Sequence, residues 1–529
     1  MPLIIKDEYP EKLFREDGKR LDGRDKHELR PIKMEVGVVK NADGSAYLEW
    51  GNNKIFCAVY GPRDVHPHYL AKPDKGILRV FYRMATFSVF DRKRPAPGRR
   101  EKEISMVLAD CLEPLLFLEL YPGNSFEVFI NVMDADGGTR CGCATVAALA
   151  LADAGVPMRS LVTAVAVGKI DGELVTDLSG IEDKAGDADL PCAITWFNEE
   201  ISLLQFDGSM DLKEFDEVLT LAKNALIKIH EMQLNTLKNK YIAIQEEYSG
   251  GKKKKMMNTK RVISIIEKNY ILNNLRKEER IDGRGLWEYR DWTIKPDVIT
   301  SAEGSADVTL GDTRIITGLK YDVGTPFPDL PEEGVCTFMA ELLPLASPIF
   351  ERGPPSEQSI ELARVVDRGI RHADCVQTKK LCIKANKAVY ILFVDLYVIN
   401  YSGNLIDVGG ISSLTTLISS HIPEGKWVDD QIEWTGKYLT GETIVNELPI
   451  VTTYGKIGDI IFLDPTLPEE LVSDGKISIS VTESKIVSIQ KSGLATFSIE
   501  EINMLTKKSM EMGKKLRKEL NLWQYKVKI

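Results

Sequence analysis

The residues with the clearest capacity for chemistry form one short run, Asp136-Gly137-Gly138-Thr139-Arg140. Two glycines allow the backbone to approach a ligand closely, and the alanine-rich residues 141–154 that follow predict a helix. The N–H groups at a helix N-terminus attract anions, and a guanidinium beside them could hold a phosphate with two N–H groups. Taken alone, the run is more simply interpreted as a tight turn before a buried helix.

A basic segment between Asp91 and Glu103 could bind the same kind of ligand. It contains six basic and three acidic residues in a chain whose formal net charge is −10. Two prolines stiffen the segment and exclude a helix interior. A stiff loop that presents Arg94, Arg99 and Arg100 suits a polyphosphate backbone. A solvated basic loop is an equally good interpretation of this segment by itself.

Carboxylates gather in a third segment, Glu182 to Asp189. Four acidic side chains within eight residues, with a glycine among them, predict a turn. Their oxygens suit Mg²⁺, and a carboxyl held near another, or near a phosphate, could have a raised pKa and act as an acid. A solvated acidic loop is the simpler interpretation of this segment alone. A phosphate cradle, paired arginines and paired carboxylates together are nevertheless what phosphoryl transfer requires.

The elements that position these residues come in two copies. Leu21-Asp-Gly-Arg24 recurs as Ile281-Asp-Gly-Arg284, and Ala42-Asp-Gly-Ser-Ala46 recurs as Ala302-Glu-Gly-Ser-Ala306, each 260 positions later. A register that stays constant over such a span indicates a duplicated domain.

We place the first copy at residues 1–248, a glycine- and lysine-rich linker at 249–260 and the second copy at 261–529. In each copy short strands, a glycine turn, a helix and further strands follow one another without strict βαβ alternation. This order predicts an α+β fold of mixed sheets packed with helices. Each copy should close with a long helix, for which Asp211 and Ser498 are the expected N-caps.

The second copy does not keep the three chemical segments. By sequence, Gly403-Asn404-Leu405 takes the place of Gly138-Thr139-Arg140, and its last residue cannot bind a phosphate. Glu469-Glu470 takes the place of Glu182-Asp183, and no further carboxylate follows to match the first copy. A helical run at residues 359–372 carries three arginines at spacings that put them roughly on one face. They are Arg364, Arg368 and Arg371. This face could guide a polyanion, or it could simply be exposed.

The amino-acid composition limits the classes of protein to which this chain can belong. The 529 residues are enough for two to four domains, and 43% apolar with 28% charged residues is typical of globular proteins. We expect no membrane span and no signal peptide, and the eight scattered cysteines predict reduced thiols in a cytoplasmic protein. The acidic balance argues against a surface coated in positive charge for duplex DNA, although not against a local basic groove.

The motifs resemble those of the RNase PH family. The resemblance rests on KNADGSA, DADGGTR, LADAGVPMR and EDKAGDADLP in the first copy, and on ELLPLASPIFERGPP and IELARVVDRGIR in the second. The first copy resembles the catalytic-type ring subunit of the archaeal RNA exosome, and the second resembles its non-catalytic partner. The resemblance implies a phosphorolytic 3′→5′ exoribonuclease that releases nucleoside diphosphates and can run in reverse as an RNA-tailing enzyme. It also implies a six-domain ring closed by three copies of the chain, with separate RNA-binding cap subunits and single-stranded RNA as partners.

The resemblance implies roles for individual residues. Inorganic phosphate would be bound by Gly138, Thr139, Arg140 and Arg100. Catalysis would depend on Arg100, Asp183 as general acid or metal ligand, and Asp189 as a second ligand of Mg²⁺ or Mn²⁺. RNA would be contacted by Arg94, Arg99, His68, Arg364, Arg368 and Arg371. Because related catalytic subunits often carry an arginine where this chain has His68, RNA contact there would be weaker or more dependent on pH.

Two other functions are kept open. A catalytically silent RNA-threading scaffold should have lost its phosphate-binding and acidic residues, whereas the first copy retains the whole set. A bacterial-type polynucleotide phosphorylase should carry the site in its second copy and continue into an RNA-binding tail, whereas here the first copy carries it. Whether the fusion is natural is not visible in the sequence.

Overall fold

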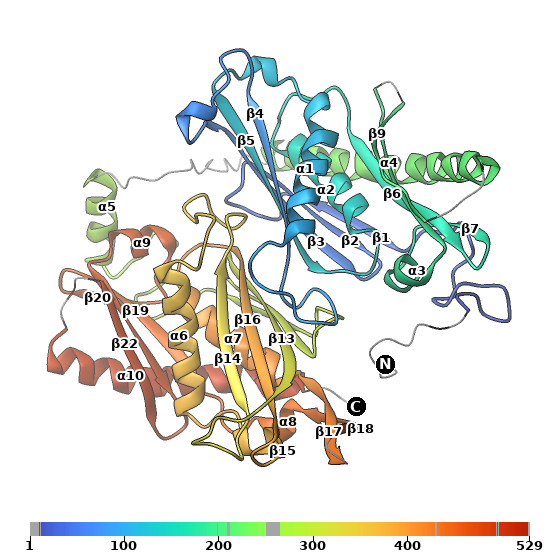
Figure 1. Cartoon of the computed structure of the whole chain (residues 1–529). Helices are drawn as coiled ribbons and strands as arrows, with labels where there is room; N and C mark the ends of the chain where they lie inside the picture. Colours follow the sequence, from blue (N-terminus) through green and yellow to red (C-terminus); the bar gives the residue numbers. More distant parts are fainter. Residues whose placement is uncertain are drawn as a thin grey trace. The chain divides into compact units, whose positions relative to one another are not determined.

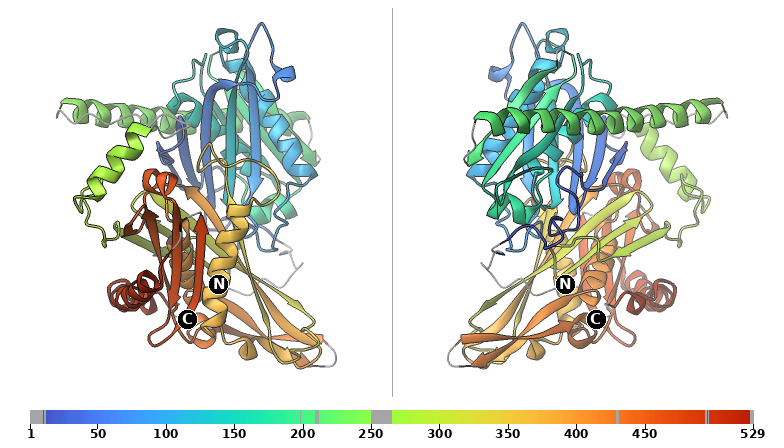
Figure 2. Two further views of the ribbon diagram at one scale, coloured as in Figure 1. Left: turned by 90° about the vertical axis from the view of Figure 1, so that its left-hand side faces the viewer. Right: turned by 90° about the vertical axis from the view of Figure 1, so that its right-hand side faces the viewer.

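The computed structural model describes residues 10, 12–197, 199–208, 212–249, 265–428, 431–493, 495 and 497–526. The chain divides into two compact units, of which one comprises Met1–Val89 with Lys93–Met257 and the other Phe90–Arg92 with Asn258–Ile529. We describe each unit by itself (Figures 1 and 2). Most of the predicted linker at 249–260 lies outside the described residues, as does the expected cap Asp211, so both stay predictions.

The first sheet of the first unit is built around a long central strand. Its five strands are β1 (Ile32–Val36), β2 (Gly44–Trp50), β3 (Asn53–Asp64), β4 (Ile77–Met84) and β5 (Asn124–Asp134). They are ordered β1-β2-β3-β5-β4, and all neighbours are antiparallel except β4 and β5. Because β3 and β5 pair along most of their length, the residues that follow β5 lie beside the start of β3.

A buried helix joins this sheet to a second one. Helix α2 (Thr139–Asp153) is buried from Cys141 to Leu151, as expected for a helix that is apolar on all sides, and it packs against β2, β3 and β6. Helix α1 (Arg99–Leu112) lies against β4 (Figure 1).

The second sheet has the order β10-β8-β6-β7, with β9 also paired to β8. Its strands are β6 (Val162–Ile170), β7 (Glu173–Thr176), β8 (Ala188–Thr195), β9 (Glu200–Leu204) and β10 (Asp207–Gly208). The short helix α3 (Gly180–Ala185) joins β7 to β8, and the long helix α4 (Leu212–Ser249) packs against β6 and β1.

The second unit repeats this plan. Its first sheet has six strands, in the order β11-β12-β13-β16-β14 with β15 also paired to β16. Its second sheet has four strands, in the order β20-β19-β21-β22. The strands of the first are β11 (Trp292–Pro296), β12 (Gly304–Leu310), β13 (Thr313–Gly324), β14 (Val335–Leu342), β15 (Cys382–Lys384, paired to β16) and β16 (Ala388–Asn400). Those of the other are β19 (Ile450–Ile457), β20 (Ile460–Leu463), β21 (Gly475–Val481) and β22 (Ile486–Gly493).

The described residues of the second unit form six α-helices, of which four match the helices of the first unit. They are α5 (Ile265–Leu275), α6 (Glu357–His372), α7 (Leu405–Ile418), α8 (Gly441–Ile444), α9 (Leu467–Val472) and α10 (Ile499–Leu520). An inserted hairpin consists of β17 (His421–Val428) and β18 (Gln431–Thr440). The Ser498 side chain accepts a hydrogen bond from the N–H of Glu501 at 3.1 Å, which confirms the predicted cap of α10. Among the described residues, no helix is both long and apolar enough to cross a membrane.

Candidate active site in the first unit

The glycine turn requires both of its glycines. Gly137 and Gly138 have φ angles of 72° and 66°, in the left-handed region that side chains disfavour. A Cβ on Gly137 would lie 2.5 Å from the carbonyl carbon of Ser179, so the turn also lies against the start of α3. Helix α2 begins directly after the turn, and no described side chain caps its N-terminus. The sequence prediction of an open helix N-terminus behind a glycine turn is therefore met.

Arg140 is held toward the second sheet. Its Nη1 donates to Oε1 of Gln205 at 2.5 Å, and the N–H of Gln205 donates to the carbonyl of Pro191 in β8 at 3.1 Å. This contact fixes the guanidinium near Asp189 on the same strand. Sequence reasoning missed Gln205, because nothing in its local pattern distinguishes it from a surface glutamine.

Asp183 and Asp189 lie close together. Asp183 is exposed on α3, whereas Asp189 is half-buried in β8, where Oδ1 has no hydrogen-bond partner among the described residues. The pKa of Asp189 is raised to about 7, first by burial and next by the charge of Asp183 and a hydrogen bond with it, while the Arg140 guanidinium acts in the opposite direction. Two carboxyls that cannot easily ionise together are a common source of an acid that works near neutral pH.

Arg100 belongs to the same neighbourhood. The Tyr82 hydroxyl donates to Oγ1 of Thr139 at 3.4 Å, at the first residue of α2. Burial raises the pKa of that tyrosine, and the nearby charge of Arg100 opposes this shift. The structure therefore brings Arg100, Thr139, Arg140, Asp183 and Asp189 into one region. The side chain of Arg99 lies outside the described residues.

Two carboxylates are a sufficient protein contribution for Mg²⁺. The described residues contain no group of three or more His, Cys, Asp or Glu side chains that could hold a metal ion. Mg²⁺, however, is commonly bound by one or two carboxylates together with water and substrate phosphates. Because Asp189 offers a buried oxygen without a partner and Asp183 lies beside it, the residues present fit such an ion.

Helix α3, which carries Asp183, is anchored by a buried arginine. Nε of Arg20 donates to Oε1 of Glu182 at 2.8 Å, and its two Nη groups donate to the carbonyls of Thr176 and Asp177 at 2.6 and 2.8 Å. Arg20 is fully buried. This arginine directly precedes the repeated Leu-Asp-Gly-Arg motif, so the motif marks a structural anchor of the site as well as the duplication.

The second unit repeats the anchor with the same geometry. Nε of Arg280 donates to Oε1 of Glu469 at 2.9 Å, and its Nη groups donate to the carbonyls of Leu463 and Asp464, both at 2.7 Å. Glu469 therefore stands where Glu182 stands, and the next residue, Glu470, stands where Asp183 stands.

The turn of the second unit is offset by one residue from the predicted alignment. Asn404 precedes α7 with a φ of 56°, as Gly138 precedes α2 with a φ of 66°. Ile406 therefore stands at the position of Arg140, and the predicted match with Leu405 is wrong by one residue. The glycine pattern misleads because asparagine also adopts the left-handed conformation readily. The functional conclusion is unchanged, since isoleucine offers no group to a phosphate.

An ion pair replaces the aspartate pair. Lys476 faces Gly455 across β19 and β21, as Asp189 faces Gly168 across β6 and β8. Its Nζ lies 2.6 Å from Oε1 of Glu470. Burial alone would lower the pKa of this lysine, but the charge and hydrogen bond of Glu470, together with the charges of other nearby carboxylates, raise that pKa above its ordinary value. An ammonium group thus stands where the first unit has the Asp189 carboxyl.

The fold and both sets of motifs can now be set against known proteins. The pattern of the 3′ exoribonuclease family, domain 1, matches residues 28–157 and 288–423, together half of the chain. The pattern of domain 2 of that family matches residues 160–225 and 447–511. The chain belongs to the RNase PH family of 3′ exoribonucleases. It holds two pairs of RNase PH domains 1 and 2, which confirms the predicted family and the predicted tandem α+β fold.

Curated relatives match the first half of the chain. The exosome complex component Rrp41 of Thermococcus onnurineus is 55% identical over 240 residues, which cover 45% of this chain and 96% of the relative. The Rrp41 of Archaeoglobus fulgidus is 49% identical over 243 residues, 45% of this chain and 94% of the relative.

Three solved structures are also similar. A chain of the Archaeoglobus fulgidus exosome with RNA bound to the active site is 40% identical, with a TM-score of 0.45 over 48% of this chain and 98% of that chain. A chain of an archaeal exosome core is 36% identical, with a TM-score of 0.42 over 48% and 96%. Rice Rrp46 is 23% identical, with a TM-score of 0.38 over 41% and 100%.

One of the predicted RNA-binding residues of the first RNase PH unit, His68, lies away from the site just described. His68 follows β3, whose end pairs with the start of β5, whereas the glycine turn follows the end of β5. It therefore lies at the opposite end of the sheet. Arg94 is exposed in the segment between β4 and α1. An RNA-binding role for either residue stays a prediction.

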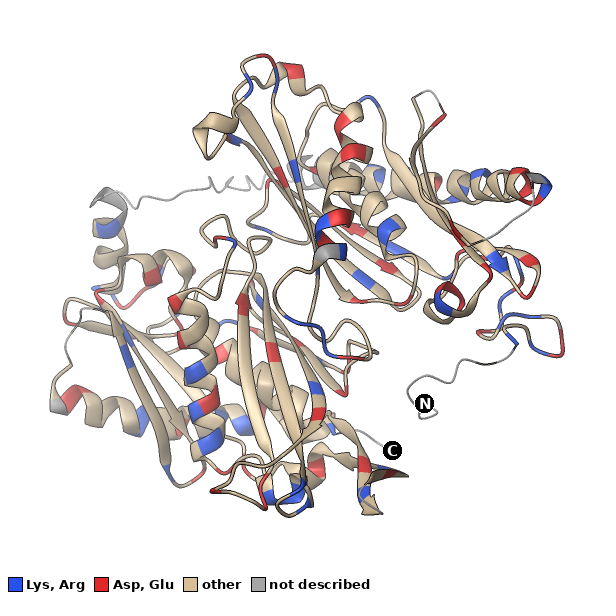
Figure 3. Cartoon of the chain, viewed as in Figure 1, with Lys and Arg blue, Asp and Glu red and all other residues tan. Residues whose placement is uncertain are grey.

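In the second RNase PH unit, basic and acidic residues alternate along α6 (Figure 3). Arg364 is exposed, Arg368 donates to Oε1 of Gln490 at 2.7 Å, and Arg371 pairs with Asp367 at 2.8 Å. Two of the three predicted RNA-guiding arginines thus have partners within their own unit, and their role toward RNA stays a prediction.

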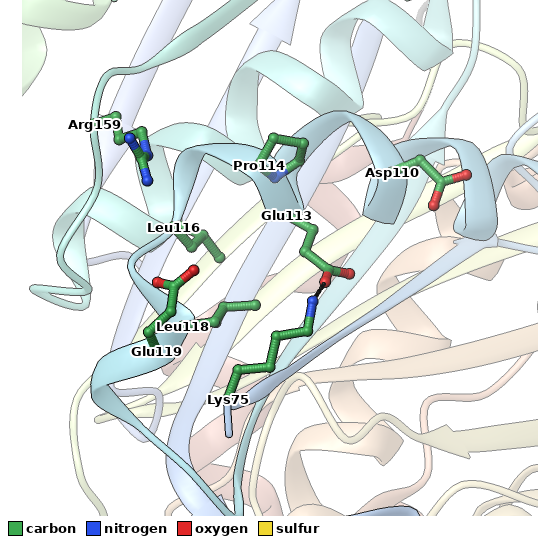
Figure 4. Close-up of a pocket in the computed structure, with 8 residues that line it drawn as sticks. All are labelled: Lys75, Asp110, Glu113, Pro114, Leu116, Leu118, Glu119 and Arg159. Atoms are coloured by element: carbon green, nitrogen blue, oxygen red, sulfur yellow. Dashed lines mark hydrogen bonds and ion pairs between the residues drawn. The ribbon is translucent and has the colours of Figure 1, made fainter. Parts of the chain in front are cut away.

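A pocket of about 340 Å³ in the first RNase PH unit lies away from the site (Figure 4). It is lined by Lys75, Asp110, Glu113, Pro114, Leu116, Leu118, Glu119 and Arg159. Its lysine already pairs with Glu113 at 2.9 Å, and none of the predicted site residues lines it.

Proposed function

We propose that this chain is a phosphate-dependent 3′→5′ exoribonuclease of an exosome ring. The observation that carries the proposal is the Asp183–Asp189 pair beside Arg140 and the glycine turn, present in the first unit and replaced by Glu470–Lys476 in the second. The names of the Rrp41 relatives as exosome complex components support the same function.

The first unit supplies the groups that phosphorolysis needs. The open N-terminus of α2, with Gly138, Thr139 and Arg140, would bind inorganic phosphate, and Arg100 would offset the repulsion between this phosphate and the RNA. A phosphate oxygen attacks the phosphorus of the last phosphodiester, and the bond from that phosphorus to the 3′ oxygen of the preceding nucleotide breaks. The products are a nucleoside diphosphate and an RNA one nucleotide shorter. The same groups catalyse the reverse reaction, which lengthens RNA and releases phosphate.

The leaving 3′ oxygen needs a proton, and we assign its delivery to Asp183. This carboxyl is exposed on α3, and it lies beside Asp189, whose pKa is raised to about 7 by burial and by the charge of Asp183. In the alternative role of Asp183, both carboxylates would be ionised and would hold Mg²⁺, which would neutralise charge that develops on the phosphates and on the leaving oxygen.

The tandem organisation supports a ring assembly. We propose that three copies of the chain close a six-domain ring in the cytoplasm, with one competent and one silent site in each chain. Single-stranded RNA is the proposed substrate. His68, Arg94, Arg99, Arg364, Arg368 and Arg371 are the proposed RNA contacts, and separate cap subunits are the proposed RNA-selecting partners.

The decisive experiment incubates the purified chain with labelled single-stranded RNA and Mg²⁺, with and without inorganic phosphate. Nucleoside diphosphates that form only with phosphate are expected, and Asp183→Asn should abolish them. Asp187→Asn is the matched control, because this neighbouring carboxylate accepts a bond from the N–H of Gly172 at 2.9 Å and is assigned no role in the reaction. Nucleoside monophosphates formed without phosphate would contradict phosphorolysis. RNA binding without any product would indicate the silent scaffold.

A further inference from the structure

Asp136 precedes the two glycines of the turn and has no part in the reaction described above. Its Oδ1 accepts a hydrogen bond from the N–H of Gly180 at 2.9 Å, and its Oδ2 accepts one from Nδ2 of Asn52 at 3.0 Å. Gly180 is the first residue of α3, and Asp183 follows one helical turn later, with its N–H donating to the carbonyl of Ser179 at 2.8 Å. A single carboxylate therefore links the phosphate-binding turn to the helix that carries Asp183.

The turn and α3 also pack so closely that neither Gly137 nor Gly180 could carry a side chain without a clash. A Cβ on Gly180 would lie 2.8 Å from Oδ1 of Asp136, and one on Gly137 would lie 2.7 Å from the nitrogen of Gly180. On its other side the turn is held by Asn53, whose Oδ1 accepts from the N–H of Asp136 at 2.6 Å and whose Nδ2 donates to the carbonyl of Gly137 at 2.7 Å. With the turn fixed to the first sheet, a change in the Asp136 contact would move α3 relative to it.

The second unit shows that the same turn and helix pack together without this carboxylate. Ser402 stands at the position of Asp136 and carries no carboxylate. The N–H of Leu467, the first residue of α9, instead donates to the main-chain carbonyl of Ser402 at 3.0 Å. The carboxylate is thus present in the unit that has the phosphate-binding and acidic residues and absent from the unit that lacks them.

We propose that Asp136 is a positioning residue of the phosphorolytic site, which sets the distance between the phosphate-binding turn and Asp183. This proposal rests on the proposed function. Asp136 does not touch the reacting atoms in this role. It affects the rate because a misplacement of about 1 Å in a catalytic group can cost on the order of 100-fold.

Two substitutions separate positioning from charge. Asp136→Asn removes the charge but keeps an oxygen that can accept from the N–H of Gly180, so kcat should stay within about threefold. Asp136→Ser installs the residue of the second unit, loses the contact, and should lower kcat on the order of 10- to 100-fold. Phosphate affinity, measured by calorimetry, should be equal in the two variants, because both lack the charge and both keep the phosphate-binding residues.

Asp171→Asn is the control for a general loss of carboxylate bonds. Asp171 accepts a bond of the same kind, from the N–H of Leu13 at 2.7 Å, away from the site. The Asp171→Asn substitution should leave kcat unchanged.

Hydrogen exchange at α3 gives a readout that does not depend on activity. The amide of Gly180 should exchange faster in Asp136→Ser than in Asp136→Asn or the unaltered chain. Equal exchange in all three, an unchanged kcat in Asp136→Ser, or equal losses in both variants would overturn the positioning role. Absence of product from the unaltered chain would instead refute the proposed function, and the exchange data would still test the link.

Discussion

At the scale of single residues, the site depends on groups that fix the reacting side chains in place. Gln205 is the clearest example, since its Oε1 accepts from Nη1 of Arg140 at 2.5 Å. A neutral acceptor orients the guanidinium without competing with an anionic ligand for its charge.

Gln205→Glu should therefore weaken phosphate binding. The new carboxylate would pair with Arg140 and compete with phosphate, so the KM for phosphate should rise on the order of 10-fold with little change in kcat. Gln205→Ala should raise it by only about two- to fivefold, because the guanidinium loses its orientation but keeps its full charge. Steady-state kinetics at several phosphate concentrations check both values, and a Gln205→Glu variant with an unchanged KM would contradict the assignment.

At the scale of elements, the same arginine anchor holds α3 in the first unit and α9 in the second. Arg20→Ala would leave the buried carboxylate of Glu182 with only the Ser179 N–H at 2.7 Å and the more distant Arg24 at 3.9 Å, and breaking a buried ion pair typically costs about 3–5 kcal/mol. Arg280→Ala should cost the second unit a similar amount through Glu469. Lys19→Ala is the control, since Lys19 lies 3.9 Å from Asp25 in an exposed pair worth about 0–1 kcal/mol. Calorimetric unfolding checks all three, and an Arg20→Ala chain as stable as the control would refute the anchor.

The anchor also predicts a dependence of stability on pH. Burial tends to raise the pKa of Glu182, but the hydrogen bond and charge of Arg20, with hydrogen bonds from Ser179, together hold that pKa below the ordinary 4.5. A carboxyl with a depressed folded-state pKa contributes stability that is fully present above 4.5 and is lost as the pH falls through the folded value. The difference in unfolding free energy between the unaltered chain and Arg20→Ala should therefore shrink below pH 4.5. A difference that stays constant with pH would show that the bonds to the carbonyls of Thr176 and Asp177 dominate.

Local pattern predicted the elements better than the contacts between them. The left-handed glycines and the helix behind Arg140 follow from the sequence, because turn and helix signals act over a few residues. Gln205 lies 65 positions from Arg140, and the link from Asp136 to Gly180 spans 44 positions. Such pairs depend on how the sheets align, so a single sequence carries no signal for them.

At the scale of the whole molecule, duplication allows one site to change while its fold persists. Both units keep the buried arginine anchor and the sheet order, yet Lys476 and Ile406 stand where the first unit has Asp189 and Arg140. The Lys476 ammonium neutralises the buried Glu470 carboxylate. It also occupies the position at which the two aspartates of the first unit could hold a metal cation. We therefore expect the second unit to be stable as a scaffold and not to bind phosphate at the same position.

Each chain should bind one inorganic phosphate, not two. Calorimetric titration with phosphate should give a stoichiometry of one per chain, and Arg140→Ala should abolish it because the phosphate loses its guanidinium. Ile406→Ala, at the same position of the second unit, is the matched control and should leave the stoichiometry at one. Two phosphates per chain, or binding that survives Arg140→Ala and disappears with Lys476→Ala, would mean that the second unit holds the anion and would reverse the assignment of the two units.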